Sequence, residues 1–175
     1  MNVLHSRVGW QDGLSDERGN LIPLMEAQAS SEVENTVTTN DELFRADVDA
    51  LAVPTPQVKE AQRYRTALRG GYTTLESRPL TTQTAFDVCS HLQGRPVIIR
   101  NQTGTSIGTP RTEERIYTPP VGETVIRDHL SAWDRFIHGD HGIESLIVMA
   151  LAHYQFETIH PFFDGNGRTG RIVNL

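Results

Sequence analysis

The stretch His160-Pro-Phe-Phe-Asp-Gly-Asn-Gly-Arg-Thr-Gly-Arg171 follows a long apolar segment near the end of a chain of 175 residues. Proline disfavours the helical region for the residue before it, so the helix that we expect over residues 143–157 must end before His160. A loop would then present His160. Glycines on both sides of Asn166 allow a concave backbone whose amides converge on an anion. A helix that starts at Asn166 or Gly167 would add its positive end, so the pattern predicts a phosphate-binding loop.

Two arginines and one carboxylate extend this interpretation. Arg168 and Arg171 share one face of the expected helix, in its first turn, where the macrodipole disfavours cations unless an anion is bound. A nucleotide triphosphate supplies such an anion. Asp164 can bind the magnesium ion that accompanies it, because this ion prefers hard oxygen ligands. His160 is left as a base, since an unperturbed histidine titrates near neutral pH and can accept a proton from a hydroxyl.

Each of these residues has a simpler explanation when it is taken alone. A loop of Asp, Gly, Asn and Gly is most often a plain turn, and helix arginines usually face solvent. A histidine before a proline is commonly incidental. The combination of a base, a metal-binding carboxylate, a glycine-built anion site and two arginines within twelve residues favours a catalytic site instead.

The run from His160 to Arg171 resembles the signature of the Fic family of protein AMP-transferases, His-Pro-Phe-x-Asp/Glu-Gly-Asn-Gly-Arg-x-x-Arg, at every defined position. The resemblance implies a mainly α fold: a Fic-type helical domain with one β-hairpin flap and an amino-terminal inhibitory helix. It implies transfer of AMP from ATP, with Mg²⁺, to a Tyr, Thr or Ser hydroxyl of a target protein. His160 would deprotonate that hydroxyl.

The same resemblance assigns roles to the rest of the motif, with Phe162 as a core anchor and not a catalyst. Asp164 would bind magnesium. Arg168 would stabilise the transferring and leaving phosphates, and Arg171 would clamp the γ-phosphate. The α- and β-phosphates would be held by Gly165, Asn166 and Gly167.

A second motif, Ser30-Ser-Glu-Val-Glu34-Asn35, resembles the inhibitory Ser/Thr-x-x-x-Glu-Gly/Asn helix that precedes the core in one class of the family. Glu34 is the inhibitory glutamate by that match. Ser30 and Glu34 lie four residues apart, on one helix face, and a carboxylate there can form a bidentate pair with Arg171 in place of the γ-phosphate. Spacing alone would favour a solvated helix glutamate, and the co-occurring signature motif reverses that preference.

Hydrophobic periodicity predicts the remaining elements. Residues 106–108 and 115–117 are expected to form the strands of a β-hairpin, which resembles the flap that pairs with a target protein by strand addition. Gly70 and Gly71 should end one helix, and the last full helix is apolar almost all round, as is typical of a buried central helix. The expected helices cover residues 20–34, 58–68, 82–92, 125–137 and 143–157.

The domain organisation that follows has an irregular amino terminus at 1–19, an amino-terminal Fic region with the inhibitory helix at 20–95, and a Fic core at 96–175. The family's core continues past the second arginine, so this core is expected to be incomplete at its carboxyl end.

A net charge of -6 without a basic cluster argues against nucleic acid as a partner. The sequence has no apolar run long enough to cross a bilayer and no signal peptide. Its lone cysteine, Cys89, is expected to be buried. These features predict a cytoplasmic protein without a membrane partner.

Three activities are compatible with these residues. The first is AMP transfer to a protein hydroxyl, restrained by Glu34, with self-modification as one form of it. The second is removal of AMP from a modified protein, for which Glu34 would position a water molecule. The third is a nucleotide-binding or protein-interaction fragment without catalysis.

Overall fold

The computed structural model describes residues 17–33, 39, 42, 45, 53–102, 107–108 and 115–174. The chain divides into two compact units, Met1–Arg65 and Thr66–Leu175. Helix α4, Pro56–Leu75, begins in the first unit and ends in the second. The elements that carry the signature motif all belong to the second unit.

Helix α2 of the first unit comprises Glu17–Val33. It starts before the expected residue 20, so Pro23 lies inside the helix. Proline lacks the N–H that would bond back to residue 19, but this loss does not end the helix. Ala27 and Ser30 of α2 are buried, at 0% and 3% exposure.

Helix α4 is longer than the sequence pattern suggests. We expected it to end at Gly70 and Gly71, but it continues to Leu75, so that prediction is wrong. A Cβ atom at Gly71 would lie 3.1 Å from Cγ2 of Val88. Gly71 is thus explained by close packing between two helices of the second unit and not by a helix end.

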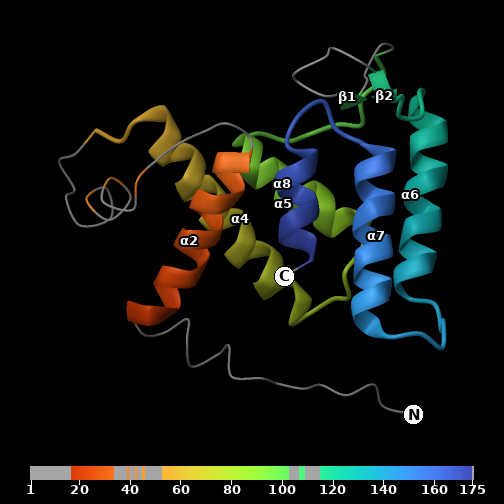
Figure 1. The fold of residues 1–175 in the computed structure, drawn as a ribbon, viewed down its shortest axis with the longest axis horizontal. Coiled ribbons are helices and arrows are strands. Elements are labelled where there is room, and N and C mark those ends of the chain that lie inside the picture. The colour runs from red at the N-terminus through yellow and green to blue at the C-terminus, as the bar shows by residue number, and fades with distance from the viewer. Residues whose placement is uncertain are drawn as a thin grey trace. The chain divides into compact units, whose positions relative to one another are not determined.

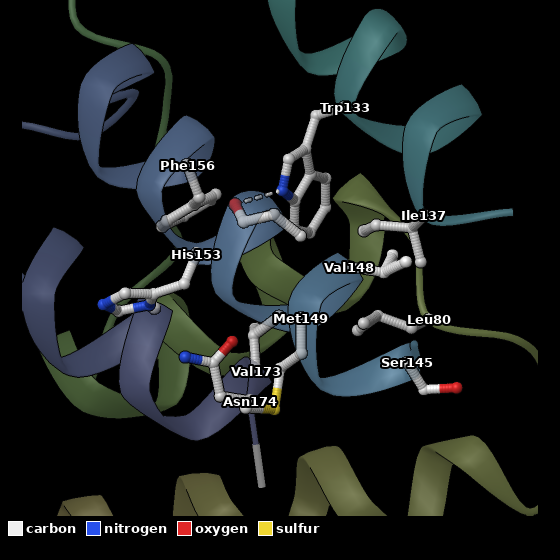
Figure 2. Close-up of a pocket in the computed structure, with 12 residues that line it drawn as sticks. Leu80, Trp133, Ile137, Ser145, Val148, Met149, His153, Phe156, Val173 and Asn174 are labelled. Carbon is white, nitrogen blue, oxygen red and sulfur yellow. Dashed lines mark hydrogen bonds between the residues drawn. The ribbon is translucent and has the colours of Figure 1, made fainter. Parts of the chain in front are cut away.

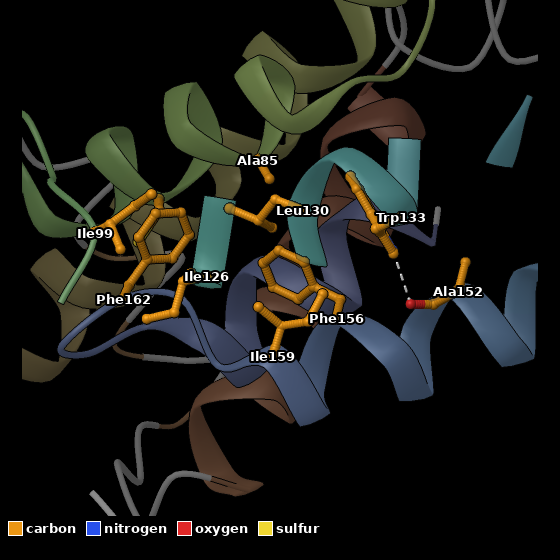
Figure 3. Packing of buried hydrophobic residues seen from close by; sticks show 10 residues of the cluster. Ala85, Ile99, Ile126, Leu130, Trp133, Ala152, Phe156, Ile159 and Phe162 are labelled. Carbon is orange, nitrogen blue, oxygen red and sulfur yellow. Dashed lines mark hydrogen bonds between the residues drawn. The ribbon is translucent and has the colours of Figure 1, made fainter. Parts of the chain in front are cut away.

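Three further helices of the second unit lie close to their expected positions: α5 at Thr82–Gln93, α6 at Glu123–Ile137 and α7 at Ser145–Ile159. The last helix, α8, is Asn166–Val173. Helices α6 and α7 lie side by side, and α8 packs against α5 and α7 (Figure 1). The core between them contains Ala85, Cys89, Ile99, Ile126, Leu130, Trp133, Ala152, Phe156, Ile159 and Phe162 (Figure 3). A buried hydrogen bond from Trp133 Nε1 to the Ala152 carbonyl oxygen, 2.9 Å long, ties α6 to α7.

Two short strands lie between α5 and α6. Strand β1, Ile107–Gly108, pairs antiparallel with β2, Arg115–Tyr117, with Ile107 opposite Tyr117 and a register irregularity next to it. The expected strand residue Ser106 and the segment 109–114 lie outside the described residues. The paired strands are therefore the part of the expected hairpin that the structure describes.

Helix α7 is not buried all round, in contrast to our expectation. Phe156 and Ile159 on one side are in the core, whereas Leu146 and Tyr154 are 72% and 71% exposed. An apolar composition cannot distinguish a helix covered on every side from one covered on a single side, because the pattern carries no information about neighbours. No helix in the described part of the chain, α7 included, is long and apolar enough to span a bilayer.

The two sides of α7 predict different costs of mutation. Phe156→Ala should lower the free energy of unfolding by about 3–5 kcal/mol, because it opens a cavity in the core. Tyr154→Ala, two residues away on the exposed side, should change it by within about 0.5 kcal/mol. Urea unfolding of both variants measures the difference. Equal losses would mean that Tyr154 is covered in solution.

Candidate active site

His160 follows the last residue of α7 in a left-handed backbone conformation, with φ 48° and ψ 60°. It is the one non-glycine residue with positive φ in the described part of the chain. Its N–H donates to the Phe156 carbonyl oxygen over 3.0 Å, which closes the end of the helix. The expectation that the helix ends before His160 is confirmed. The left-handed conformation of His160 turns the chain sharply into Pro161.

Asn166 holds the loop that follows. Its side-chain Oδ1 accepts a hydrogen bond from the N–H of Phe162 at 2.8 Å, and its Nδ2 donates to the Phe162 carbonyl oxygen at 2.9 Å. Both residues are buried, and the Phe162 ring meets Phe86 edge to face, with ring centroids 5.0 Å apart. The prediction that Phe162 is a core anchor is confirmed. Since the Asn166 side chain is engaged here, its backbone N–H is the group that remains for an anion.

Gly165 and Asp164 form the tip of the loop. Gly165 has φ 82°, and a Cβ atom there would lie 2.9 Å from Nε2 of Gln93, so glycine fits both the conformation and the space. The Asp164 carboxylate accepts hydrogen bonds from the Gly165 N–H at 2.7 Å and from Gln93 Nε2 at 3.1 Å. Its side chain is nevertheless 67% exposed. An exposed carboxylate oriented by two donors is suited to bind a hydrated divalent cation.

Helix α8 starts at Asn166, within the predicted range, and at its amino end the Thr169 N–H donates a hydrogen bond to the Gly165 carbonyl oxygen over 2.9 Å. The amides of Asn166 and Gly167 precede that bond and lie at the positive end of the helix, where backbone N–H groups have no partner within the helix. This end of α8 coincides with the segment for which the sequence predicts anion binding.

The two arginines of the motif differ in their surroundings. Arg168 lies in the first turn, its side chain is 8% exposed, and its Nη2 lies 3.5 Å from Oδ1 of Asp164. Arg171 lies in the last turn of α8, since the helix has only eight residues. The prediction that both occupy the first turn is therefore wrong for Arg171, whose charge the macrodipole favours. Of the two arginines, only Arg168 lies where the macrodipole opposes its charge. A bound anion would offset that unfavourable interaction.

Cys89 lies beneath this loop and is buried, as expected. Its Sγ donates to the Asp164 carbonyl oxygen over 3.5 Å. Burial raises the pKa of the Cys89 thiol to about 11, so the thiol stays protonated at neutral pH. Cys89 therefore supports the loop and is not a nucleophile.

The structure brings His160, Asp164, Gly165, Asn166, Gly167 and Arg168 together in one continuous turn and helix start. Ser30 belongs to the other unit, on α2, and Glu34 lies outside the described residues. In the described part of the chain, no three His, Cys, Asp or Glu side chains are grouped as a metal cluster. A metal bound at Asp164 would therefore need phosphate oxygens or water as its remaining ligands.

Two cavities flank this region. One of about 150 Å³ adjoins the loop and is lined by Phe162, Phe163, Asp164, Gln93 and residues 95–98. The second, of about 190 Å³, lies by the carboxyl-terminal half of α8 and is mainly apolar. Figure 2 shows His153 of α7 at its edge, opposite Trp133 and Ile137 of α6. His153 lines this second cavity and not the one beside the motif loop, so it has no role in that loop.

Two residues near the motif were not found by sequence analysis. Gln93 contacts Asp164, as described above, and Arg100 binds backbone carbonyls around His160. Arg100 Nε donates to the His160 carbonyl oxygen at 2.5 Å, and its Nη2 donates to that of Pro120 at 2.6 Å. The sequence signal for Arg100 is weak: a single charge directly after the apolar run 97–99. Gln93 has no such signal.

Comparison with protein families gives two adjacent matches. Residues 19–73 match the model of the Fic/DOC family N-terminal region, and residues 79–175 match that of the Fic/DOC family itself. The second match covers more than half of the chain. The chain belongs to the Fic/DOC family.

Individual relatives share shorter or more distant similarity. The protein adenylyltransferases Fic of Drosophila yakuba and Drosophila melanogaster are each 39% identical over 46 residues, which is 25% of this chain and 9% of theirs. A Fic family protein from Desulfovibrio desulfuricans superposes with a TM-score of 0.71 at 18% identity, over 96% of this chain and 51% of that one. A Fic domain containing signaling protein from Bacteroides thetaiotaomicron has a TM-score of 0.67 at 18% identity, over 94% and 67%. At this identity the two structures show the fold alone.

The Asn166 hydrogen bonds predict the stability of the loop. Asn166→Ala should lower the free energy of unfolding by about 2 kcal/mol, because it leaves the buried Phe162 N–H and carbonyl without partners. Asn101→Ala, at an exposed position, is the control and should have an effect within about 0.5 kcal/mol. Thermal and urea unfolding measure both. A loss no larger than that of the control would show that the loop is held by other contacts.

Proposed function

We propose that this chain is a protein adenylyltransferase, which moves AMP from ATP to a Tyr, Thr or Ser hydroxyl of a target protein. The observation that carries the proposal is the single turn in which a histidine, an exposed carboxylate and the open amino end of α8 follow one another. Membership of the Fic/DOC family and the local similarity to the Drosophila adenylyltransferases support it. The chain corresponds to a small part of those relatives, so its activity is inferred from its own residues.

His160 would take the proton of the attacking hydroxyl while the hydroxyl oxygen forms a bond to the α-phosphorus of ATP. The bond from that phosphorus to the bridging oxygen breaks, and pyrophosphate leaves. Gly165, Asn166 and Gly167 would hold the α- and β-phosphates through backbone amides, which stabilise negative charge without reorganisation during the reaction. Positioning and electrostatic stabilisation supply most of the catalysis in such phosphoryl chemistry.

Arg168 and Asp164 would contribute opposite charges at the same place. Arg168 is largely buried beside the loop, so its charge would act on the transferring and leaving phosphates with little screening by water. Arg171 would bind the γ-phosphate. Asp164 would hold Mg²⁺, which neutralises phosphate charge when bound, and the exposure of its carboxylate supports that role.

The β1–β2 pair is the element that we propose for the target protein. A short two-stranded sheet has unpaired backbone groups along its edges, and an extended segment of the target can add to such an edge by main-chain hydrogen bonds. This mode of binding would select an extended segment with a hydroxyl side chain. It would bring that hydroxyl within reach of His160.

ATP labelled on the α-phosphate tests the activity. The chain should label itself or proteins of a cell extract in the presence of Mg²⁺, and His160→Ala should abolish labelling while ATP binding, measured by calorimetry, persists. His129→Ala, an exposed histidine on α6, is the matched control and should label normally. Removal of a pre-existing label would indicate the hydrolase instead. ATP binding without either reaction would indicate a nucleotide-binding fragment, and labelling by His160→Ala would contradict the role of the base.

We also propose that Glu34 restrains this activity. The proposal rests on the match of Ser30 and Glu34 to the inhibitory motif and on the burial of Ser30, which is unusual for a serine on a solvated helix. A glutamate that pairs with Arg171 would occupy the place of the γ-phosphate and prevent its productive binding. Removing the glutamate would leave Arg171 available to ATP.

Glu34→Gly should therefore raise labelling, by about tenfold if the pair contributes the coupling free energy usual between linked sites. Glu32→Gly is the control: Glu32 is exposed on α2 and accepts a hydrogen bond from Gln28 Nε2, and the change introduces the same glycine. The double variant of Glu34→Gly with Arg171→Ala should resemble Arg171→Ala alone, because residues that act through each other are not additive. Unchanged labelling in Glu34→Gly would mean that Glu34 is an ordinary surface residue.

A further inference from the structure

Arg100 is an unusually placed charge. It follows the apolar run 97–99, is only 1% exposed, and is among the largest fully buried side chains of the described residues. Taking a guanidinium out of water costs several kcal/mol unless strong hydrogen bonds compensate. In the described part of the chain, no carboxylate forms an ion pair with it. The compensation comes from backbone carbonyls.

These carbonyls surround His160. Arg100 Nε donates to the His160 carbonyl oxygen at 2.5 Å, and Nη2 donates to the Ile159 carbonyl oxygen at 3.3 Å. The Arg100 backbone N–H donates to the Pro161 carbonyl oxygen at 2.9 Å. One residue thus fixes three consecutive carbonyl groups. They lie at the negative end of α7, where the macrodipole favours a cation.

Fixing these carbonyls determines where His160 points. The peptide groups before and after His160 are both bonded, and their orientation sets φ and ψ of this residue and hence the direction of its Cα–Cβ bond. A histidine does not prefer the left-handed region that it occupies here, so the surrounding bonds must hold it there. Arg100 supplies the bonds to its carbonyl side.

Arg100 also reaches toward the strand pair. Its Nη2 donates to the Pro120 carbonyl oxygen at 2.6 Å, three residues after β2 ends at Tyr117. Arg100 itself precedes β1 by seven residues. A single guanidinium therefore joins the chain on one side of the β1–β2 pair to the turn that carries His160.

We infer that Arg100 is a positioning residue, which holds the His160 backbone in its left-handed conformation and fixes it relative to the base of the β1–β2 pair. This inference rests on the proposed function insofar as His160 is the base and the strand pair holds the target. Arg100 itself touches no reacting atom. Its effect on catalysis is to keep the base aligned with a hydroxyl that the strands present, and misplacement of such a group by about 1 Å can cost about 100-fold in rate.

Two variants test the inference in the whole chain. Arg100→Lys keeps the charge but has one nitrogen, which cannot bond three carbonyls in the geometry of a guanidinium. Arg100→Met removes the charge and keeps the volume. The maximal rate of self-labelling from α-labelled ATP should fall about tenfold in Arg100→Lys and about 100-fold in Arg100→Met. The ATP concentration for half that rate should stay within about threefold in both, because Arg100 lies behind the base and not at the phosphates.

A second readout needs no activity. Amide hydrogen exchange at His160, followed by NMR, should be about tenfold faster in both variants, whereas the amides of Leu130 and Trp133 in α6 should be unchanged. Arg127→Lys and Arg127→Met are the matched controls, because Arg127 is exposed and pairs with Glu123, and they should alter neither readout.

The outcomes separate the inference from the proposed function. If the parent chain never labels but exchange at His160 is faster in the Arg100 variants, the positioning role of Arg100 is retained and the transferase is overturned. An active parent whose Arg100 variants keep its maximal rate would overturn the inference and retain the transferase. Loss of the fold in both Arg100 variants would also overturn it, because Arg100 would then be a general structural residue. A rise in the half-saturating ATP concentration without a fall in rate would place Arg100 at the nucleotide and contradict positioning of the base.

Discussion

Two hydrogen bonds between the Asn166 side chain and the Phe162 backbone connect the core to the loop of the motif. Phe162 is fixed by the aromatic side chains around it, and Asn166 is the first residue of α8. The pair therefore determines where α8 begins relative to the core. The direction of its amino end, the position of Asp164 and the burial of Arg168 all follow from that starting point. A phosphate site of the kind proposed, made largely of backbone amides, needs such a fixed origin, because it has few long side chains that could adapt.

Local chemistry explains what the sequence could predict. Pro161 ends α7, and the glycine beside Asn166 permits a left-handed turn. These preferences depend on a few neighbouring residues and hold in any fold. The start of α8 was accessible for the same reason, the burial of Cys89 followed from its apolar neighbours, and the anchoring role of Phe162 was implied by the resemblance to the Fic family. Residues far apart in sequence were not, so the contact of Gln93 with Asp164 gave no signal.

Two of the incorrect predictions, those on α4 and α7, share one physical cause. Glycines at positions 70 and 71 suggested a helix end, but Gly71 instead allows α5 to approach α4 closely. The apolar sequence of α7 suggested complete burial, but its composition says nothing of how many neighbours the helix has. In each case a tertiary neighbour gives the residue its meaning, and a periodic pattern cannot identify that neighbour.

The left-handed conformation of His160 has a consequence for the evolution of this fold. Asparagine and glycine enter that region of backbone space more readily than histidine, by about 1 kcal/mol. Position 160 therefore holds a residue that the proposed chemistry requires and local conformation opposes. In a lineage released from selection for catalysis, we expect drift at this position toward asparagine or glycine, accompanied by a gain in stability. Relatives that have lost the histidine can thus be well folded proteins, whose preserved loop still has the amides that we propose for nucleotide binding.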